Sequence, residues 1–308
     1  MDISSILSLL QTSVELGLVS SLTVLALFLS YTMLNVCDLS TDGCFTLGAA
    51  VGAVVALSGH PFLSIPAAML AGVTSGFITG MLQTKMGIDS LLSGIIVNTA
   101  LYSINIAIMG NSSLINLNKT ETVFTILKTA LSGTSMAGMY KAVIAVIAVA
   151  ATVIFLALFL STRLGLAIRA TGNNPDMVRS SSINPVFTTL VGLCVANAFT
   201  ALSGCMLGQL QKSVNIDIGT GMVTMALASL LIGRAFLGRG KITTRAIGAV
   251  LGAVIFRIVY AVALRFNMPA FMLKFVSSVI VIIAISGPYL KSRIPVIKRR
   301  LSAKKARA

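Results

Sequence analysis

The chain has 308 residues, of which 56% are hydrophobic and only 10% are charged, and its mean hydropathy is +0.97. Soluble domains carry about 25% charged residues, so this composition excludes a soluble globular protein and, because nearly every window is apolar, a disordered one. The net charge of +15 does not indicate nucleic-acid binding, because the basic residues concentrate in windows 161–185, 232–246 and 291–308, a pattern typical of cytoplasmic membrane loops.

Apolar stretches separated by polar or Gly- and Pro-containing breaks predict eight or nine transmembrane helices, because one span needs roughly 20 apolar residues. No linker divides the chain, so we expect an all-α polytopic membrane protein with a single domain over residues 1–308. The predicted spans lie near residues 16–36, 44–59, 62–84, 89–109, 140–161, 186–209, 219–234, 246–266 and 270–290.

The basic windows also predict the orientation. If all three face the cytoplasm, the spans between them come in pairs, which is self-consistent. The C-terminus is then cytoplasmic, and the polar loop near 110–139 lies outside. Counting back along the spans places the N-terminus outside as well. We expect the basic tail 291–308 to contact lipid headgroups rather than nucleic acid.

A polar segment from Asn35 to Gly43 interrupts the apolar sequence between the first two spans. It carries two carboxylates, Asp38 and Asp42, which are unfavourable at membrane depth unless they face protein, water or a ligand. Two interpretations are open. Either Asn35, Asp38, Thr41 and Asp42 line a solute pathway at a broken helix, or one of the aspartates caps the next helix.

The segment Asp38–Thr41 has a counterpart in Asp217–Thr220, and both precede short, Gly-containing spans. On the expected topology the two copies lie at opposite membrane faces, as the copies of an inverted repeat do. The sequence therefore predicts a possible inverted repeat whose interrupted segments mark a transporter binding site.

Three polar side chains share one face of the fourth span. Asn98, Tyr102 and Asn105 follow one another at i, i+4 and i+7, a spacing that aligns them on a helix. They either form hydrogen bonds between helices or line a translocation path.

One basic residue, Arg257, falls near the middle of the eighth span. An unpaired charge is unfavourable there. We expect Arg257 to pair with Asp38 or Asp42, or to line the same path as the other polar residues.

Between the fifth and sixth spans, the sequence predicts a short helix over about residues 174–182. Asn174 is a favourable N-cap, Pro175 suits the first helical position and Asp176 favours the positive helix end. Pro185 is expected to end the helix after about two turns. A short, capped helix at the cytoplasmic surface indicates a docking element.

This segment resembles a known family. The stretch GLAIRATGNNPDMVRSSSINP (165–185) is similar to the coupling-helix region of ABC-importer permeases of the branched-chain amino-acid and ribose type, whose pattern is roughly G-x-A-x-R-A-x-G-x-N-x-x-x-A-x-x-x-G-I. Val178 and Ser182 depart from it at a small-residue and a glycine position. The run DLSTDGCFTLGAAVGA (38–53) also resembles the interrupted second span of that family. The matching positions are Gly165, Ala167, Arg169, Ala170, Gly172, Asn174 and Ile183.

The resemblance covers about residues 14–290 and implies an inner-membrane permease, expected as a homodimer. Its implied partners are a cytoplasmic ABC ATPase dimer and an extracytoplasmic solute-binding lipoprotein. ATP and Mg would bind to the ATPase, and this chain would bind no cofactor. The resemblance implies that the short helix inserts into the ATPase, with coupling roles for Arg169, Gly172, Asn173, Asn174, Pro175, Asp176 and Arg179.

We therefore expect the permease subunit of an ATP-driven importer for an amino acid, because the likeness is greatest to permeases for aromatic amino acids such as tryptophan and tyrosine. An ion-coupled secondary transporter of a small polar solute is an alternative, favoured by the intramembrane charges. A permease for another solute, such as a sugar, is a further alternative. A membrane enzyme is disfavoured, because no catalytic or metal-binding set is visible and GRAFLGRGK (233–241) does not fit the Walker pattern.

Overall fold

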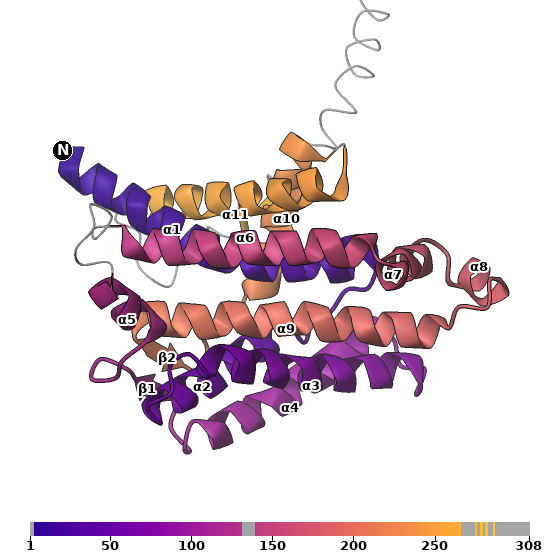
Figure 1. Cartoon of the computed structure of the whole chain (residues 1–308), viewed down its shortest axis with the longest axis horizontal. Coiled ribbons are helices and arrows are strands. Elements are labelled where there is room, and N and C mark those ends of the chain that lie inside the picture. Colours follow the sequence, from indigo (N-terminus) through magenta and orange to yellow (C-terminus); the bar gives the residue numbers. More distant parts are fainter. Residues whose placement is uncertain are drawn as a thin grey trace, which may run out of the picture.

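The computed structural model of the protein describes residues 3–130, 139–238 and 240–265, together with residues 275, 278, 279, 281, 282 and 286. The described residues form a helical bundle with one two-stranded sheet (Figure 1). In chain order the elements are α1 (Ile3–Leu27), the π-helix η1 (Phe28–Met33), α2 (Thr41–Leu57), α3 (Ser64–Thr84), α4 (Ser90–Ile108), β1 (Leu114–Asn116), α5 (Val123–Ala130), α6 (Tyr140–Ser161), α7 (Arg163–Asn173), α8 (Pro175–Ser180), α9 (Pro185–Gln211), β2 (Ser213–Asn215), α10 (Met222–Leu237) and α11 (Ile242–Arg265).

The helices match most of the predicted spans. Each of the first eight predicted spans coincides with a helix, since a backbone in lipid must satisfy its own hydrogen bonds. Six helices are long and apolar enough to cross a membrane, whereas α2 and α10 have 17 and 16 residues. The ninth predicted span, 270–290, lies mostly outside the described residues, and the basic tail 291–308 lies wholly outside them.

The central helices of the bundle are α9 and α1. In the most apolar window of each, 78% of the residues are buried, compared with 28% in α4 and 33% in α6. Small residues let α2 and α3 approach α9 closely. A Cβ on Gly48 would collide with the backbone of Ala201, and one on Gly72 with that of Asn197. Polar groups of α2 therefore come within reach of α9.

The bundle has two distinct ends. Figure 1 shows the start of α1, α5 and the small sheet at one end, and α7 with α8 at the other. In the sheet, β1 pairs antiparallel with β2. The loop predicted near 110–139 contains β1 and α5. Neither element has an apolar run long enough to predict it from the sequence.

The two basic windows that the structure describes, 161–185 and 232–246, lie at the same end. Arg169 of α7 and Arg234 of α10 are both close enough to Arg245 of α11 to interact with it electrostatically. This agrees with the prediction that both windows face one side of the membrane.

Candidate functional site

The polar segment between η1 and α2 is organised around a buried carboxylate. Asp38 is only 2% exposed. Its Oδ1 accepts hydrogen bonds from Ser40 N at 2.8 Å and Ser40 Oγ at 2.6 Å, and its Oδ2 accepts one from Asn197 Nδ2 of α9 at 2.8 Å. The Thr41 hydroxyl donates to the Asp38 carbonyl oxygen at 2.9 Å. The N-cap of α2 is Ser40, and no side-chain hydrogen bond caps the helix, so Asp38 does not cap α2 but fixes the turn that leads into it and ties this turn to α9.

Asp42, in the first turn of α2, caps a more distant helix than the one predicted. Its Oδ2 accepts from Gly221 N at 2.9 Å and its Oδ1 from Val223 N at 2.8 Å. Gly221 is the N-cap of α10 and has no side chain to cap the helix itself. A carboxylate at this position satisfies free N–H groups and interacts favourably with the positive helix end. Asp42 therefore links α2 to α10.

The segments Asp38–Thr41 and Asp217–Thr220 do not lie at opposite membrane faces. Asp42 directly follows the first segment and is bonded to Gly221, which directly follows the second. A Cβ on Gly219 would collide with the Asp42 carbonyl oxygen. The predicted placement of the two copies is therefore wrong, because capping of α10 brings them together.

A polar cavity of about 390 Å³ lies beside this contact. One wall comes from α2, another from α4 and a third from the segment between β2 and α10. The lining holds two carboxylates with amide and hydroxyl groups, and it includes no Lys, Arg or His. The lining residues are Asp42, Gly43, Thr46, Asn98, Thr99, Tyr102, Ser103, Asn105, Ile216, Asp217 and Thr220.

Four of the predicted pathway residues meet at this cavity: Asp42, Asn98, Tyr102 and Asn105. Their shared helical face explains why three of them come from α4. Tyr102 is 51% exposed. Asn105 is buried, and its amide donates to the Gly43 carbonyl oxygen of α2 at 3.1 Å. This face therefore both bonds two helices together and lines the cavity.

Sequence reasoning missed five polar residues of the lining: Thr46, Thr99, Ser103, Asp217 and Thr220. Thr99 and Ser103 are one turn apart on α4, next to the predicted residues, so the same helical spacing could have found them. The only sequence signal at Asp217 and Thr220 is the similarity of their segment to Asp38–Thr41. Nothing in the sequence around Thr46 signals that it faces a cavity.

The remaining predicted pathway residues lie outside the lining: Asn35, Asp38, Thr41 and Arg257. Arg257 donates to Ser20 Oγ of α1, from Nη2 at 2.8 Å and Nε at 3.2 Å. Pairing with Asp38 or Asp42 is therefore a wrong prediction. The reason is that α11 packs against α1, whereas the two carboxylates are engaged by α9 and α10.

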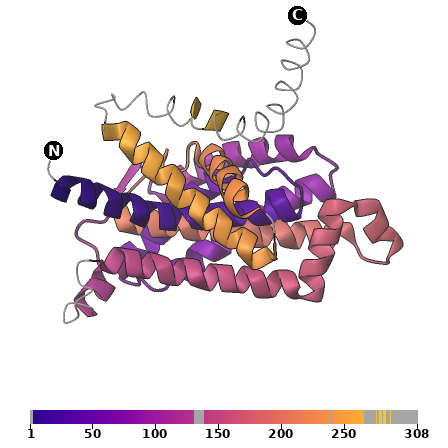
Figure 2. The same ribbon diagram turned by 90° about the horizontal axis from the view of Figure 1, so that it is seen from above.

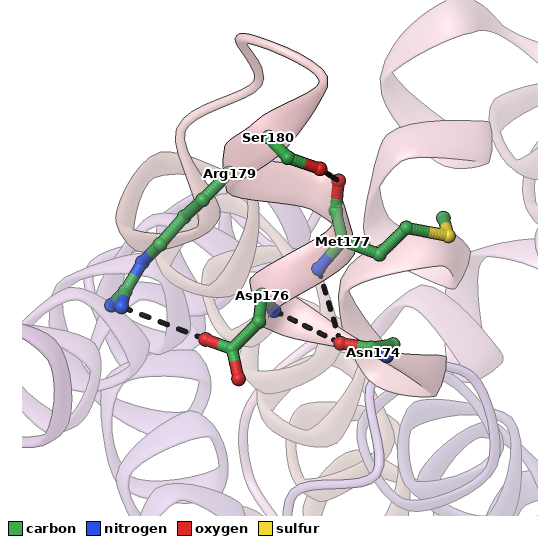
Figure 3. Close-up of polar contacts among 5 residues, drawn as sticks. All are labelled: Asn174, Asp176, Met177, Arg179 and Ser180. Carbon is green, nitrogen blue, oxygen red and sulfur yellow. Dashed lines mark hydrogen bonds and ion pairs between the residues drawn. The ribbon is translucent and has the colours of Figure 1, made fainter.

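At the other end of the bundle, local hydrogen bonds hold α8 (Figure 3). Asn174 Oδ1 accepts from Asp176 N and from Met177 N, both at 3.1 Å, and Pro175 stands at the start of the helix, as predicted. Asp176 and Arg179 form an exposed ion pair at 3.8 Å. The Met177 side chain is 53% exposed. The helix thus presents apolar and charged groups together to the outside.

The α8 segment is anchored at one point and ends earlier than predicted. Val178, which replaces a small residue of the family pattern, is 1% exposed. The helix ends at Ser180, and the chain reverses at Ser182, whose φ is 60°. Pro185 does not end α8 but stands in the first turn of α9, which Asn184 caps. The prediction that Pro185 closes the short helix is therefore wrong.

The preceding helix, α7, connects α8 to the bundle and was not predicted as a separate element. Gly172 packs against the end of η1, where a Cβ would collide with the Met33 carbonyl oxygen. Arg169 is half-buried near Arg245. Two predicted coupling residues, Arg169 and Gly172, therefore belong to the end of the bundle. The other five are exposed on or beside α8: Asn173, Asn174, Pro175, Asp176 and Arg179.

Comparison with known proteins identifies relatives over most of the chain. Residues 9–285 match the family described as "Branched-chain amino acid transport system / permease component". A tyrosine transport system permease protein from Clostridioides difficile (strain R20291) is 30% identical over 267 residues, covering 86% of each chain. A nucleoside ABC transporter permease protein from Lactococcus lactis is 27% identical over 173 residues, covering 52% of this chain and 48% of that protein. No solved structure matches the chain significantly.

Proposed function

Because the chain belongs to the family of permease components of branched-chain amino-acid transport systems, we propose that it is the transmembrane subunit of an ATP-driven importer for an amino acid. It would lie in the inner membrane with an extracytoplasmic N-terminus and a cytoplasmic C-terminus. Its partners would be a cytoplasmic ABC ATPase dimer that binds ATP and Mg, an extracytoplasmic solute-binding lipoprotein and a second permease copy. The permease itself would hydrolyse nothing.

The observation that carries this proposal is the short helix α8. It is the outermost helix at its end of the bundle in both views (Figures 1 and 2). Its fold is fixed by the Asn174 cap, and its outer surface carries Met177 with the Asp176–Arg179 pair. A rigid helix with an exposed mixed surface is suited to insert into a cleft of a partner, since little ordering is needed on binding.

A continuous set of contacts leads from α8 towards the cavity. Through α7, Gly172 rests on the end of η1, and η1 leads into the segment that Asp38 holds. Asp42 at the start of α2 is bonded to α10 beside the cavity. We propose that movement of α8 by the ATPase reaches the cavity along this route, because packed helices move as rigid bodies.

The cavity supports an amino acid as the solute. Its carboxylates, Asp42 and Asp217, with no basic side chain in the lining, favour a group with positive charge such as an α-ammonium. Tyr102 offers an aromatic face to an aromatic side chain or the ammonium. The tyrosine permease covers much more of this chain than the nucleoside permease does. A sugar or nucleoside remains the alternative solute.

The alternative of an ion-coupled secondary transporter is weaker in the structure than in the sequence. In the sequence, this alternative was favoured by charged residues at membrane depth. In the structure, Asp38 is bonded to Asn197 and Ser40, and Arg257 is bonded to Ser20. These groups have structural partners within the bundle.

Gentle solubilisation from native membranes tests the proposal, and we expect a stoichiometric ATPase to co-purify. Uptake that depends on a proton or sodium gradient, with no ATPase present, would overturn it. In reconstituted vesicles, Asn98→Ala and Tyr102→Ala should each lower uptake about tenfold, the effect of losing one or two contacts. Ile95→Ala and Ile104→Ala are matched controls, since both are exposed on α4 outside the cavity and should leave uptake unchanged.

A further inference from the structure

Three arginines from three helices converge at the end of the bundle that carries α7. Arg234, in the last turn of α10, donates from Nη2 to Thr32 Oγ1 at 2.8 Å, and its guanidinium lies 5.9 Å from the centre of the Tyr31 ring. Arg245, in the first turn of α11, lies 5.7 Å from the centre of the Phe28 ring. Both therefore surround η1. Arg169 of α7 is close enough to act on Arg245 electrostatically. We refer to Arg169, Arg234 and Arg245 as the arginine cluster.

None of the acidic side chains that the structure describes pairs with this cluster. No Asp or Glu follows Asp217 anywhere in the sequence. Glu121 and Asp217 lie in the chain beside α5 and β2, at the opposite end of the bundle (Figure 1). The other described acidic residues have partners elsewhere: Glu15, Asp38, Asp42, Asp89 and Asp176.

One buried donor of the cluster also lacks an acceptor oxygen. Arg245 Nε is buried and has no hydrogen-bond partner among the described residues, although a buried donor without an acceptor is unfavourable. With no counter-charge beside it among the described residues, the Arg245 guanidinium is repelled by those of Arg234 and Arg169. An oxyanion placed among them would relieve both defects, and guanidinium groups match phosphate oxygens in geometry and charge.

The position of the cluster favours a phosphate that belongs to a lipid headgroup. Arg234 lies in the last turn of α10 and Arg245 in the first turn of α11. The ends of membrane helices lie at the depth of the lipid headgroups. Exposed apolar side chains flank it: Phe236 is 69% exposed and Tyr31 36%. By contrast, α8, the helix proposed to meet the ATPase, projects beyond α7 and away from α10 and α11 (Figures 1 and 2). We propose that the arginine cluster binds the phosphate of an anionic membrane phospholipid.

The test uses the full chain in neutral detergent, with bound lipid counted by native mass spectrometry after exposure to equal amounts of phosphatidylglycerol and phosphatidylcholine. The wild type should retain phosphatidylglycerol in preference, by roughly tenfold for two or three basic contacts. Arg234→Gln/Arg245→Gln should lose the preference. Lys85→Gln/Arg163→Gln removes the same charge outside the cluster and should keep it.

Three outcomes overturn the proposal. The first is a double variant of the cluster that keeps both the wild-type preference for phosphatidylglycerol and the co-purifying ATPase. The second is inorganic phosphate displacing phosphatidylglycerol, which makes the ligand a free phosphate. The third is loss of the co-purifying ATPase from the double variant with an unchanged lipid preference, which makes the cluster an ATPase contact. If the double variant does not fold, Arg245→Lys decides, because it keeps the charge and loses the forked geometry, and we expect the preference to fall about threefold.

Discussion

Two short polar segments, residues 35–42 and residues 174–182, are organised in opposite ways. In the second, Asn174 bonds to backbone groups two and three residues further along the chain. In the first, Asp38 bonds to Asn197 and Asp42 to Gly221, which are 159 and 179 residues away. One segment is held by its own sequence, and the other by helices that the fold brings to it.

This difference explains which side chains are free to act on a partner. The local cap leaves the outer surface of α8 exposed, so the helix can be built without a partner and bind one later. In the first segment, the Asp38 carboxylate is engaged in holding α2 against α9, whereas that of Asp42 both bonds to α10 and lines the cavity. A carboxylate near a helix break is therefore not sufficient reason to assign it to a solute pathway, since the same residue type serves both purposes.

The largest expected effect is that of Asp38→Ala. The change leaves Ser40 and the Asn197 amide without their shared acceptor in a buried site, so it should lower the free energy of unfolding by about 3 kcal/mol. Thermal unfolding of the permease in detergent measures this. Asp38→Asn is the control. Its amide can donate to Asn197 Oδ1, which has no partner in the wild type, once the Asn197 amide turns over, so stability and uptake should both stay near wild type. A stable Asp38→Asn protein without uptake would return Asp38 to the pathway.

The second effect is that of Gly172→Ala, at the contact between α7, which leads into the second segment, and η1, which leads into the first. Alanine normally stabilises a helix relative to glycine. Here the added Cβ would collide with the Met33 carbonyl oxygen at the end of η1, so we expect a loss of about 2 kcal/mol. The sign of the change in melting temperature decides whether the helix propensity of alanine or the collision with Met33 dominates. A more stable Gly172→Ala protein would show that α7 does not press on η1 and would remove the proposed route from α8 to the cavity.

The same comparison shows how far the sequence could predict the molecule. Apolar run length sufficed for the eight helices from α1 to α11 that correspond to predicted spans, because lipid leaves the backbone few alternatives. The helical spacing of Asn98, Tyr102 and Asn105 correctly predicted that they share a face. The partner of Arg257 could not be predicted, because it depends on which helix α11 packs against. Short elements such as α5 and β1 have no apolar run that signals them, and the local cap of α5, in which Thr122 and Thr125 bond to each other's backbone N–H groups, was missed in the sequence.

A smaller effect is expected at the α8 cap, where the chain offers a matched pair. Asn174 and Asn184 both precede a proline and cap a helix through Oδ1. Replacing either by Ala should cost about 1 kcal/mol. Only Asn174→Ala should separate ATP hydrolysis from uptake in the reconstituted transporter, because only α8 is proposed to meet the ATPase. Equal uptake per ATP in the two variants would contradict the docking role.

The smallest effect sharpens the comparison at the backbone, since each segment contains one residue in the left-handed region. Asn35 has a φ of 57° and Ser182 one of 60°. Asparagine tolerates this conformation better than serine does. Ser182→Gly should therefore stabilise the protein by about 0.5 kcal/mol. Asn35→Gly should change stability little, because the smaller relief of strain is offset by the greater freedom of glycine in the unfolded chain. Paired thermal melts measure both. Ser182 stands at the glycine position of the family pattern, so a stabilising Ser182→Gly would show that the pattern records a backbone requirement of the α8–α9 turn. An equal gain at both positions would contradict this, because it would mean that serine at 182 is no more strained than asparagine at 35.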